Sequence, residues 1–343
     1  MKIHYTGNFL GGVAEKYDGP NVQVVQMLRK LGYEVSFAGT SSNQFRRLAQ
    51  VVISILRARI RGIDLIIIDC FSTKAFYFSI VASQLSMFLR LKYALVLHGG
   101  NLPERFKKSD KLSSRLLKGA VFVASPSGYL AQAAKRAFQV EVDIIPNRIR
   151  VDENWVADDQ RGNALFWVRS LDAIYNPEMA IEVMRELNKR GLNLQLYLIG
   201  PGDPHRTRCI NNLIEDYNLN GSVRVMGRMD RSSWHRLAKK GRYFINTTTV
   251  DNTPSSVIEA MTLGLLPIST NVGGIPFILD HGINSILVDS NDYMGMSKTI
   301  IDLENNPDGR RVLLENGRSK IQATYHEGAI VKAWERALEV LHR

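Results

Sequence analysis

A capped helix start is the first feature of the chain that could do chemistry. Thr253 or Asn252 can cap a helix whose first residue is Pro254, a position where the missing N–H costs nothing. The free N–H groups at such a start, together with the helix dipole, form a binding place for a phosphate. Three residues would present these N–H groups: Ser255, Ser256 and Val257.

Two carboxylates flank this helix start. Glu259 lies more than one turn inside the helix, where its carboxylate could accept two hydrogen bonds from a ribose diol. Asp251 stands just before the helix and would face the group that the phosphate carries. The alternative is an ordinary capped helix with a solvated Asp and Glu, and this stretch alone leaves both interpretations open.

Parallel sheets are predicted to position these residues. Short apolar runs alternate with segments of helical period along the whole chain, a pattern typical of doubly wound α/β domains with helices on both faces of a parallel sheet. In such sheets ligands bind beyond the carboxyl ends of the strands. The expected strands are 2–5, 34–38, 64–68, 93–97, 121–124, 142–145, 164–168, 194–199, 223–226, 243–246, 266–269 and 285–288.

The chain is long enough for two domains. A polar stretch, Val151–Gly162, interrupts the apolar rhythm and is the candidate linker. We therefore expect a first Rossmann-like domain over 1–150 and a second Rossmann-like domain over 151–328. Residues 329–343 form an amphipathic helix that we expect to pack across both domains.

Composition narrows the class of protein. The 343 residues are 45% hydrophobic, which excludes disordered and fibrous chains. The net charge of +11 is uneven, because residues 1–150 carry 22 basic and 9 acidic side chains. A positive field of this kind favours phosphate-rich partners, either an anionic membrane surface or a nucleic acid.

Other features exclude several kinds of site. Cys70 and Cys209 are the only cysteines, which fits a reducing cytosol and excludes a disulfide scaffold or a multi-cysteine metal site. The start of the chain is expected to be a first strand rather than a signal peptide. Of the two uncharged runs, 75–89 is too short to span a bilayer and 260–279 is broken by Gly and Pro, so we expect no transmembrane helix.

The segment around Asp251 resembles the family 4 glycosyltransferases, retaining enzymes of the GT-B fold that use nucleotide sugars. The family signature places a Glu eight positions before a second Glu that is followed by Ala-Met, then a Gly and a Pro. The matching residues here are Asp251, Glu259, Ala260, Met261, Gly264 and Pro267, and the loop 270–276 resembles the next part of the family pattern.

The resemblance extends over nearly the whole chain. Gly200 and Gly202 match a Gly-x-Gly loop, and 223–228, ending in Arg228, resembles the strand and turn that hold the base. His98 matches a family His that approaches the donor sugar. Gly11 and Gly12, or alternatively Gly19 and Pro20, match the glycine turn near the diphosphate, and Asn147 matches the Pro-Asn before the linker.

Three positions depart from the family pattern. Asp251 stands where the family has a longer Glu. Arg169 matches the Arg that clamps the diphosphate, but the Lys expected about five residues later is absent. Phe277 replaces a Glu that often follows the glycine turn. These departures bear on donor identity and catalytic efficiency more than on the fold.

The resemblance implies retaining transfer of a sugar from a nucleotide-diphosphate sugar to a glycan or lipid-linked acceptor, in cell-surface polysaccharide or glycolipid synthesis. It also implies that 1–150 is the acceptor-side domain and 151–328 the nucleotide-sugar donor domain. Catalytic roles fall on His98, Asp251 and Arg169; donor-binding roles fall on Gly11, Gly12, Gly200, Gly202, Arg228, Glu259 and residues 253–257 (Thr253, Pro254, Ser255, Ser256, Val257). We expect no cofactor and no metal, in agreement with the absence of an Asp-x-Asp triplet.

The basic first domain suggests where the enzyme works. The segment 48–60 alternates apolar residues with Arg57 and Arg59, as in an amphipathic surface helix. We therefore expect a cytoplasmic protein in peripheral contact with an anionic membrane, without a nucleic-acid partner. Three alternatives stay open: a solvated basic face, a nucleotide-sugar epimerase of the same fold, and a basic nucleic-acid-binding protein.

Overall fold

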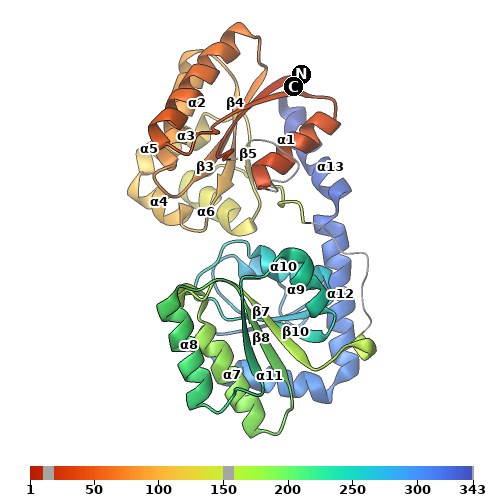
Figure 1. Cartoon of the computed structure of the whole chain (residues 1–343). Coiled ribbons are helices and arrows are strands. Elements are labelled where there is room, and N and C mark those ends of the chain that lie inside the picture. Colours follow the sequence, from red (N-terminus) through yellow and green to blue (C-terminus); the bar gives the residue numbers. More distant parts are fainter. Residues whose placement is uncertain (11–18, 150–157, 342–343) are drawn as a thin grey trace. The chain divides into compact units, whose positions relative to one another are not determined.

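Two compact units make up the chain. The computed structural model describes residues 1–10, 19–149 and 158–341. Unit 1 comprises Met1–Arg148 together with Glu327–Arg343, and unit 2 comprises Ile149–His326. Each unit is built on one six-stranded, all-parallel sheet covered by helices (Figure 1). The predicted fold class, two doubly wound α/β domains, is confirmed.

Unit 1 has the strand order β2-β1-β3-β4-β5-β6. The chain moves from β1 to β2 on one side and then returns to place β3 on the other side of β1. This reversal is a topological switch point, the position where ligands bind in open α/β sheets. The strands are β1 Lys2–Thr6, β2 Glu34–Ala38, β3 Leu65–Phe71, β4 Tyr93–His98, β5 Val123–Ser125 and β6 Asp143–Ile144.

Helices bury both faces of the unit 1 sheet. Five helices cover one face: α2 Gln44–Ile60, α3 Phe76–Phe88, α4 Leu102–Lys108, α5 Asp110–Lys118 and α6 Gly128–Phe138. The other face packs against α1 Pro20–Lys30 and α13 Glu327–Leu338. Ile66 and Ile68 point to the first layer and Leu65 and Ile67 to the second, which explains why the strand is apolar throughout.

The C-terminal helix packs within unit 1. Ile330, Trp334, Ala337 and Leu338 of α13 are buried in the core that Ile3 and Tyr5 of β1 also join, and a short turn, η4 Glu339–Leu341, follows. We expected this apolar stripe to lie across both domains. The observed core contacts of the stripe belong to unit 1.

Unit 2 repeats the architecture with the strand order β12-β11-β10-β7-β8-β9. Here the chain runs from β7 to β9 on one side and then returns to place β10 on the other side of β7. The switch point of unit 2 therefore lies between β7 and β10. The strands are β7 Ala164–Val168, β8 Gln195–Ile199, β9 Val223–Gly227, β10 Gly241–Asn246, β11 Leu266–Thr270 and β12 Ile286–Val288.

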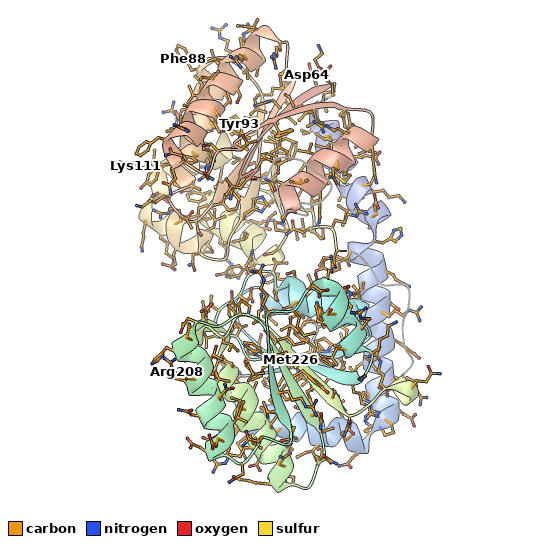
Figure 2. All side chains as sticks on the ribbon, in the orientation of Figure 1. Asp64, Phe88, Tyr93, Lys111, Arg208 and Met226 are labelled. Atoms are coloured by element: carbon orange, nitrogen blue, oxygen red, sulfur yellow. The ribbon has the colours of Figure 1, made fainter. Side chains whose placement is uncertain are left out.

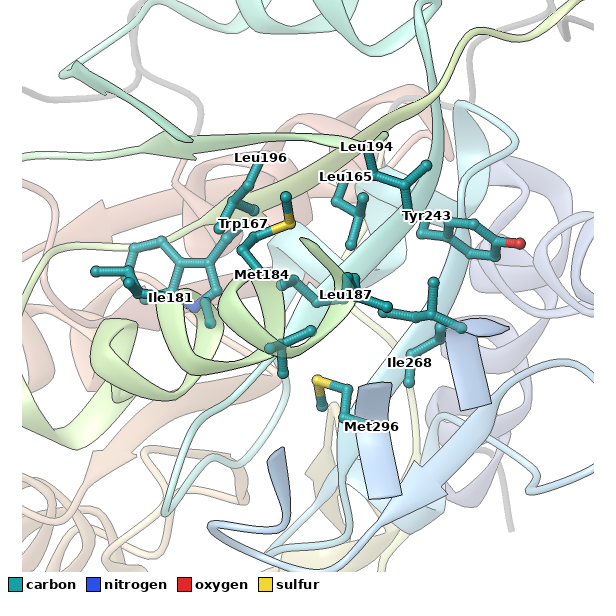
Figure 3. Close-up of a cluster of buried hydrophobic side chains, with 14 of the residues drawn as sticks. Leu165, Trp167, Ile181, Met184, Leu187, Leu194, Leu196, Tyr243, Ile268 and Met296 are labelled. Carbon is teal, nitrogen blue, oxygen red and sulfur yellow. The ribbon is translucent and has the colours of Figure 1, made fainter. Parts of the chain in front are cut away.

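Two layers of helices cover the unit 2 sheet. One core contains Trp167 and Tyr243 from the sheet and the apolar stripe of α7, including Met184 and Leu187 (Figure 3). The opposite core contains Phe166 and Phe244. The helices are α7 Pro177–Lys189, α8 Pro204–Asp216, α9 Arg231–Ala238, α10 Ser255–Thr262, α11 Tyr293–Asn305 and α12 Pro307–Tyr325, with short turns η1 Asp158–Gln160, η2 Ala173–Tyr175 and η3 Ile275–Phe277.

The candidate linker Val151–Gly162 lies in large part outside the described residues. No helix in the described part of the chain is both long enough and apolar enough to cross a membrane.

Candidate active site

Arg169 and Asp251 meet at the switch point of unit 2. Arg169 directly follows β7, and Asp251 stands in the segment after β10. A guanidinium N–H of Arg169 donates to Asp251 Oδ2, and the side chains are only 16% and 13% exposed. The guanidinium also lies over the Tyr175 ring, 5.0 Å from its centroid. Residues 82 positions apart in sequence therefore form one charged pair where the fold places ligands.

Burial affects both side chains of the Arg169–Asp251 pair. Burial raises the pKa of the Asp251 carboxyl above its ordinary value, while Arg169 and the N–H of Asn252 oppose that rise. Arg169 Nε is buried without a hydrogen-bond partner in the described part of the chain. Because a buried guanidinium N–H rarely stays unpaired, this donor is available to an anionic ligand.

Glycine-rich loops hold the pair in place. A Cβ on Gly200 would lie 1.7 Å from the carbonyl oxygen of Arg169, and one on Gly274 would lie 1.8 Å from that of Asn252. The N–H of Gly274 donates to the Asp251 carbonyl at 2.9 Å. Only glycine permits these backbones to approach so closely. The glycines therefore fix the loops that carry Arg169 and Asp251.

Helix α10 begins one residue later than the sequence suggested. Pro254 is the N-cap, with φ −68° and ψ 101°, and the helix itself starts at Ser255 without a side-chain cap. The N–H of Val257 donates to the Pro254 carbonyl at 3.1 Å, so the expectation that this N–H is free was wrong. The first N–H groups of the helix, those of Ser255 and Ser256, have no intrahelical acceptor.

Two hydroxyl groups add to this helix start. Thr253 Oγ1 and Ser256 Oγ are buried and have no hydrogen-bond partner among the described residues. A hydroxyl can donate to a phosphate oxygen, as can the backbone N–H groups beside it. The helix start therefore offers clustered donors without a protein acceptor, which is the chemistry that a phosphate requires.

Glu259 is held by two residues that the sequence analysis missed. Arg231 Nη2 lies 3.2 Å from Glu259 Oε1, and His235 Nε2 lies 3.8 Å from Glu259 Oε2. Both come from α9, four residues apart, so they share one helix face. That spacing after the helix-capping Asp230 was the available signal in the sequence.

The remaining unit 2 candidates lie in the loops after β8 and β9. Gly202 packs against Leu171 and Thr207, where a Cβ would lie 2.8 and 2.9 Å from their side chains. Arg228 follows β9 and is exposed. Gly11 and Gly12 lie outside the described residues.

His98 ends β4 in unit 1 and belongs to a chain of hydrogen bonds. Its Nε2 lies 2.9 Å from Asp69 Oδ1, which also accepts a hydrogen bond from the Tyr5 hydroxyl at 2.8 Å. The Phe71 ring stacks on the imidazole with 5.0 Å between centroids. The signal for Asp69 in the sequence was its position as the single charged residue inside an apolar strand, β3.

Metal ions are bound by clusters of side chains, and the described residues contain no such cluster. Within 1–10, 19–149 and 158–341, no three His, Cys, Asp or Glu side chains come together in an arrangement that could hold a metal ion.

Comparison with known proteins identifies the family. Residues 153–320 match the family model described as "Glycosyl transferases group 1". The chain is 28% identical over 110 residues to one component of the human phosphatidylinositol N-acetylglucosaminyltransferase, covering 32% of this chain and 22% of that protein. It is 23% identical over 171 residues to the amylovoran biosynthesis glycosyltransferase AmsK of Erwinia amylovora, covering 48% and 41%. The chain thus matches less than half the length of each of these two relatives.

The fold match covers the whole chain. Anabaena HepE in complex with UDP-glucose superposes with a TM-score of 0.71 at 15% identity, covering 100% of this chain and 99% of that one. This likeness shows a GT-B architecture. Within unit 2, residues 153–320 match the group 1 family of glycosyltransferases.

Proposed function

We propose that this chain is a retaining glycosyltransferase that moves a sugar from a nucleotide-diphosphate sugar to a glycan or lipid-linked acceptor, in cell-surface polysaccharide or glycolipid synthesis. One observation carries the proposal. The buried Arg169–Asp251 pair stands at the unit 2 switch point, and the nearby loop leads into a helix start with unpartnered hydroxyl donors. Cation, hydroxyls and backbone N–H groups are what a leaving diphosphate needs.

The residues of unit 2 take different parts in this proposal. Arg169 contacts the diphosphate with its free Nε–H, and the donors of Thr253 and Ser256 share the developing negative charge. Asp251 accepts a hydrogen bond from a donor-sugar hydroxyl. Glu259, oriented by Arg231, accepts the ribose hydroxyls. Arg231 is also our candidate for part of the role of the absent Lys.

In the proposed reaction, the acceptor oxygen replaces the diphosphate oxygen on the same face of the donor sugar. The bond from the anomeric carbon to the diphosphate oxygen breaks while the acceptor oxygen bonds to the same carbon. The acceptor proton passes to a departing diphosphate oxygen, so atoms and charge balance. His98 contacts the donor sugar. NMR assignment of the product checks the stereochemistry: a product whose anomeric configuration differs from the donor's contradicts retention.

UDP is the proposed nucleotide, because HepE, which has the same fold, is described in complex with UDP-glucose. Calorimetric titration with UDP, GDP, ADP and CMP tests this. We expect UDP to bind and Arg169→Ala to weaken its binding about 10- to 160-fold, the value of a charged hydrogen bond of about 1.5–3 kcal/mol. The matched control is Arg208→Ala, a change at an exposed arginine of α8 (Figure 2). Equal affinity in both variants contradicts the assignment.

Turnover separates the transferase from an epimerase. The transferase releases UDP from UDP-glucose or a related donor only as an acceptor is glycosylated, whereas an epimerase interconverts the nucleotide sugar alone. Chromatography of the nucleotide sugar with and without an acceptor mixture distinguishes them. Conversion of the nucleotide sugar without an acceptor would contradict the transferase and indicate an epimerase.

We also propose peripheral docking on an anionic cytoplasmic membrane face through α2. Val51, Ile55 and Ala58 bury one side of this helix in the core. The opposite side exposes a continuous apolar stripe with spacing 4, 4, 3 and 4: Phe45, Ala49, Ile53, Leu56 and Ile60. Exposed arginines beside the stripe favour anionic lipid, the arrangement of an interfacial helix: Arg46, Arg57, Arg59 and Arg61.

Neighbouring helices extend this surface. α3 packs against α2 and exposes Phe88 by 83%, and α5 carries the exposed Lys111; both side chains point outward from unit 1 in Figure 2. Flotation with liposomes, with and without anionic lipid, is the direct test. Equal and negligible binding to both kinds of vesicle would leave α2 as a solvated basic face.

A further inference from the structure

A cavity opens at the switch point of unit 1. It has a volume of about 180 Å³ and is lined by the loop after β1, including Gly7 and Asn8, by Asp69 of β3, and by α2 and α3. The neighbouring strands β1 and β3 leave their carboxyl ends here, where the chain reverses its direction across the sheet. In open parallel sheets this is the place where ligands bind.

The wall of the cavity holds an unsatisfied acceptor. Asp69 is 5% exposed, and its Oδ1 accepts hydrogen bonds from Tyr5 and His98. Its Oδ2 is buried with no hydrogen-bond partner in the described part of the chain. That oxygen lies against Gly7, which also lines the cavity: a Cβ on Gly7 would lie 2.2 Å from it. An ionised carboxylate only accepts, so its natural partner is a ligand hydroxyl.

The same cavity has a cation on its α2 side. Arg47 lines it, donates one hydrogen bond to Asn8 Oδ1 at 2.9 Å and lies over the Phe78 ring at 5.5 Å. No carboxylate pairs with it among the described residues. A guanidinium has five N–H donors, so Arg47 keeps several for an anion. The ring and the amide hold it at this position.

From these observations we propose that the cavity binds a sugar carrying a phosphate, as the terminal unit of the acceptor. A sugar hydroxyl donates to Asp69 Oδ2 and the phosphate is bound by Arg47. Pockets for drug-sized ligands hold roughly 300–1,000 Å³, so this cavity suits a single ring. The phosphate would lie at the α2 wall of the cavity, beside Arg47. This inference rests on the proposed function and specifies its acceptor.

Binding without turnover tests the cavity separately. The full chain, saturated with UDP to occupy unit 2, is titrated with glucose 1-phosphate, galactose 1-phosphate and N-acetylglucosamine 1-phosphate. The free sugars and inorganic phosphate are the matched probes. We expect one glycosyl phosphate to bind at least tenfold more tightly than either its free sugar or phosphate alone, because both contacts are then made.

Three variants locate this binding. Arg47→Ala should remove the advantage that the phosphate gives, whereas Arg46→Ala, the same charge change at the exposed neighbour, should leave affinity within twofold. Asp69→Asn should weaken sugar and glycosyl phosphate at least tenfold. Ala75→Leu adds bulk at the cavity wall without touching Asp69 and should weaken every ligand. Thermal unfolding verifies that each variant is folded, and Arg47→Ala and Ala75→Leu decide the matter if Asp69→Asn does not fold.

The outcomes separate this inference from the proposed function. The inference is overturned if no probe binds in the presence of UDP, if Arg46→Ala and Arg47→Ala have equal effects, or if Ala75→Leu binds like the wild type. A chain that turns over UDP-sugar but keeps its acceptor KM in the cavity variants also overturns it and leaves the transferase standing. Variant-sensitive binding without any UDP-sugar turnover supports the cavity and counts against the transferase.

Discussion

The apolar stripe of α2 predicts how much vesicle affinity is lost when its exposed side chains are replaced. Phe45 and Ile60 stand near its two ends and are 85% and 86% exposed. Neither contributes to the core, so replacing both by serine should leave the fold intact. If α2 lies on a membrane, the double variant Phe45→Ser with Ile60→Ser should lose a defined part of the vesicle affinity.

The expected loss follows from burial. Complete burial of a Phe or Ile side chain contributes about 1.5–3 kcal/mol. An interfacial helix immerses its apolar face only to the headgroup boundary, so we take about half of this for each exposed side chain. The double variant then loses about 1.5–3 kcal/mol, or about 10- to 160-fold in vesicle affinity.

Sedimentation with vesicles of defined anionic lipid content measures this. Val312→Ser is the matched control, because Val312 is also exposed but lies on α12 in unit 2. Arg57→Gln with Arg59→Gln should cost about 1 kcal/mol for each arginine, and this loss should shrink as salt is added. If the Phe45 and Ile60 double variant binds vesicles as tightly as the Val312 control, the stripe does not contact the membrane.

Three further perturbations have expected outcomes. Burial, with Arg61 nearby, lowers the pKa of His4 from 6.5 to about 4, so the unfolded chain binds this proton more readily than the folded one. The free energy of unfolding should therefore fall by about 3 kcal/mol from pH 7 to pH 4. In urea titrations, the difference in unfolding free energy between wild type and His4→Gln should show the same fall with pH. His98→Ala should slow sugar transfer at least ~100-fold while UDP affinity stays within twofold, as steady-state kinetics and calorimetry would show. Gly274→Ala should cost about 1–3 kcal/mol in urea unfolding, because its Cβ would meet the Asn252 carbonyl, whereas Gly221→Ala, in open space, should be neutral.

The sheets were largely predictable from the sequence. All twelve expected strands are present, and every bound except the end of β3 agrees within two residues. Buried parallel strands are apolar on both faces, so their signal does not depend on which neighbour they pair with. The largest extension is at β3, which runs on to Phe71 through Asp69, since that carboxylate is satisfied in part by Tyr5 and His98.

Side-chain partners were less predictable. The sequence placed Arg169, Asp251 and Glu259 near a nucleotide, but it did not reveal that Arg231 and His235 face Glu259, because this contact depends on how α9 packs beside α10. Helix α4, Leu102–Lys108, is too short to be recognised from the sequence, because its seven residues form too few helical turns to show a period. The start of α10 was misplaced by one residue, since proline suits both the N-cap and the first position.

The two switch points differ in the kind of hydrogen-bonding group that has no partner among the described residues: donors in unit 2 and an acceptor in unit 1. These two kinds of group are what the donor half and the acceptor half of a transfer reaction need. Among the described residues, the switch point of unit 2 has hydrogen-bond donors without a partner: Arg169 Nε and the hydroxyls of Thr253 and Ser256. Unit 1 leaves an acceptor unpaired, Asp69 Oδ2. A departing diphosphate gains negative charge and must be met by donors, whereas an acceptor sugar offers hydroxyls and must be met by a hydrogen-bond acceptor. A site for nucleotide binding alone would not require the buried carboxylate in unit 1, and for this reason the Asp69 and Ala75 variants test the acceptor half of the reaction more directly than any change in unit 2.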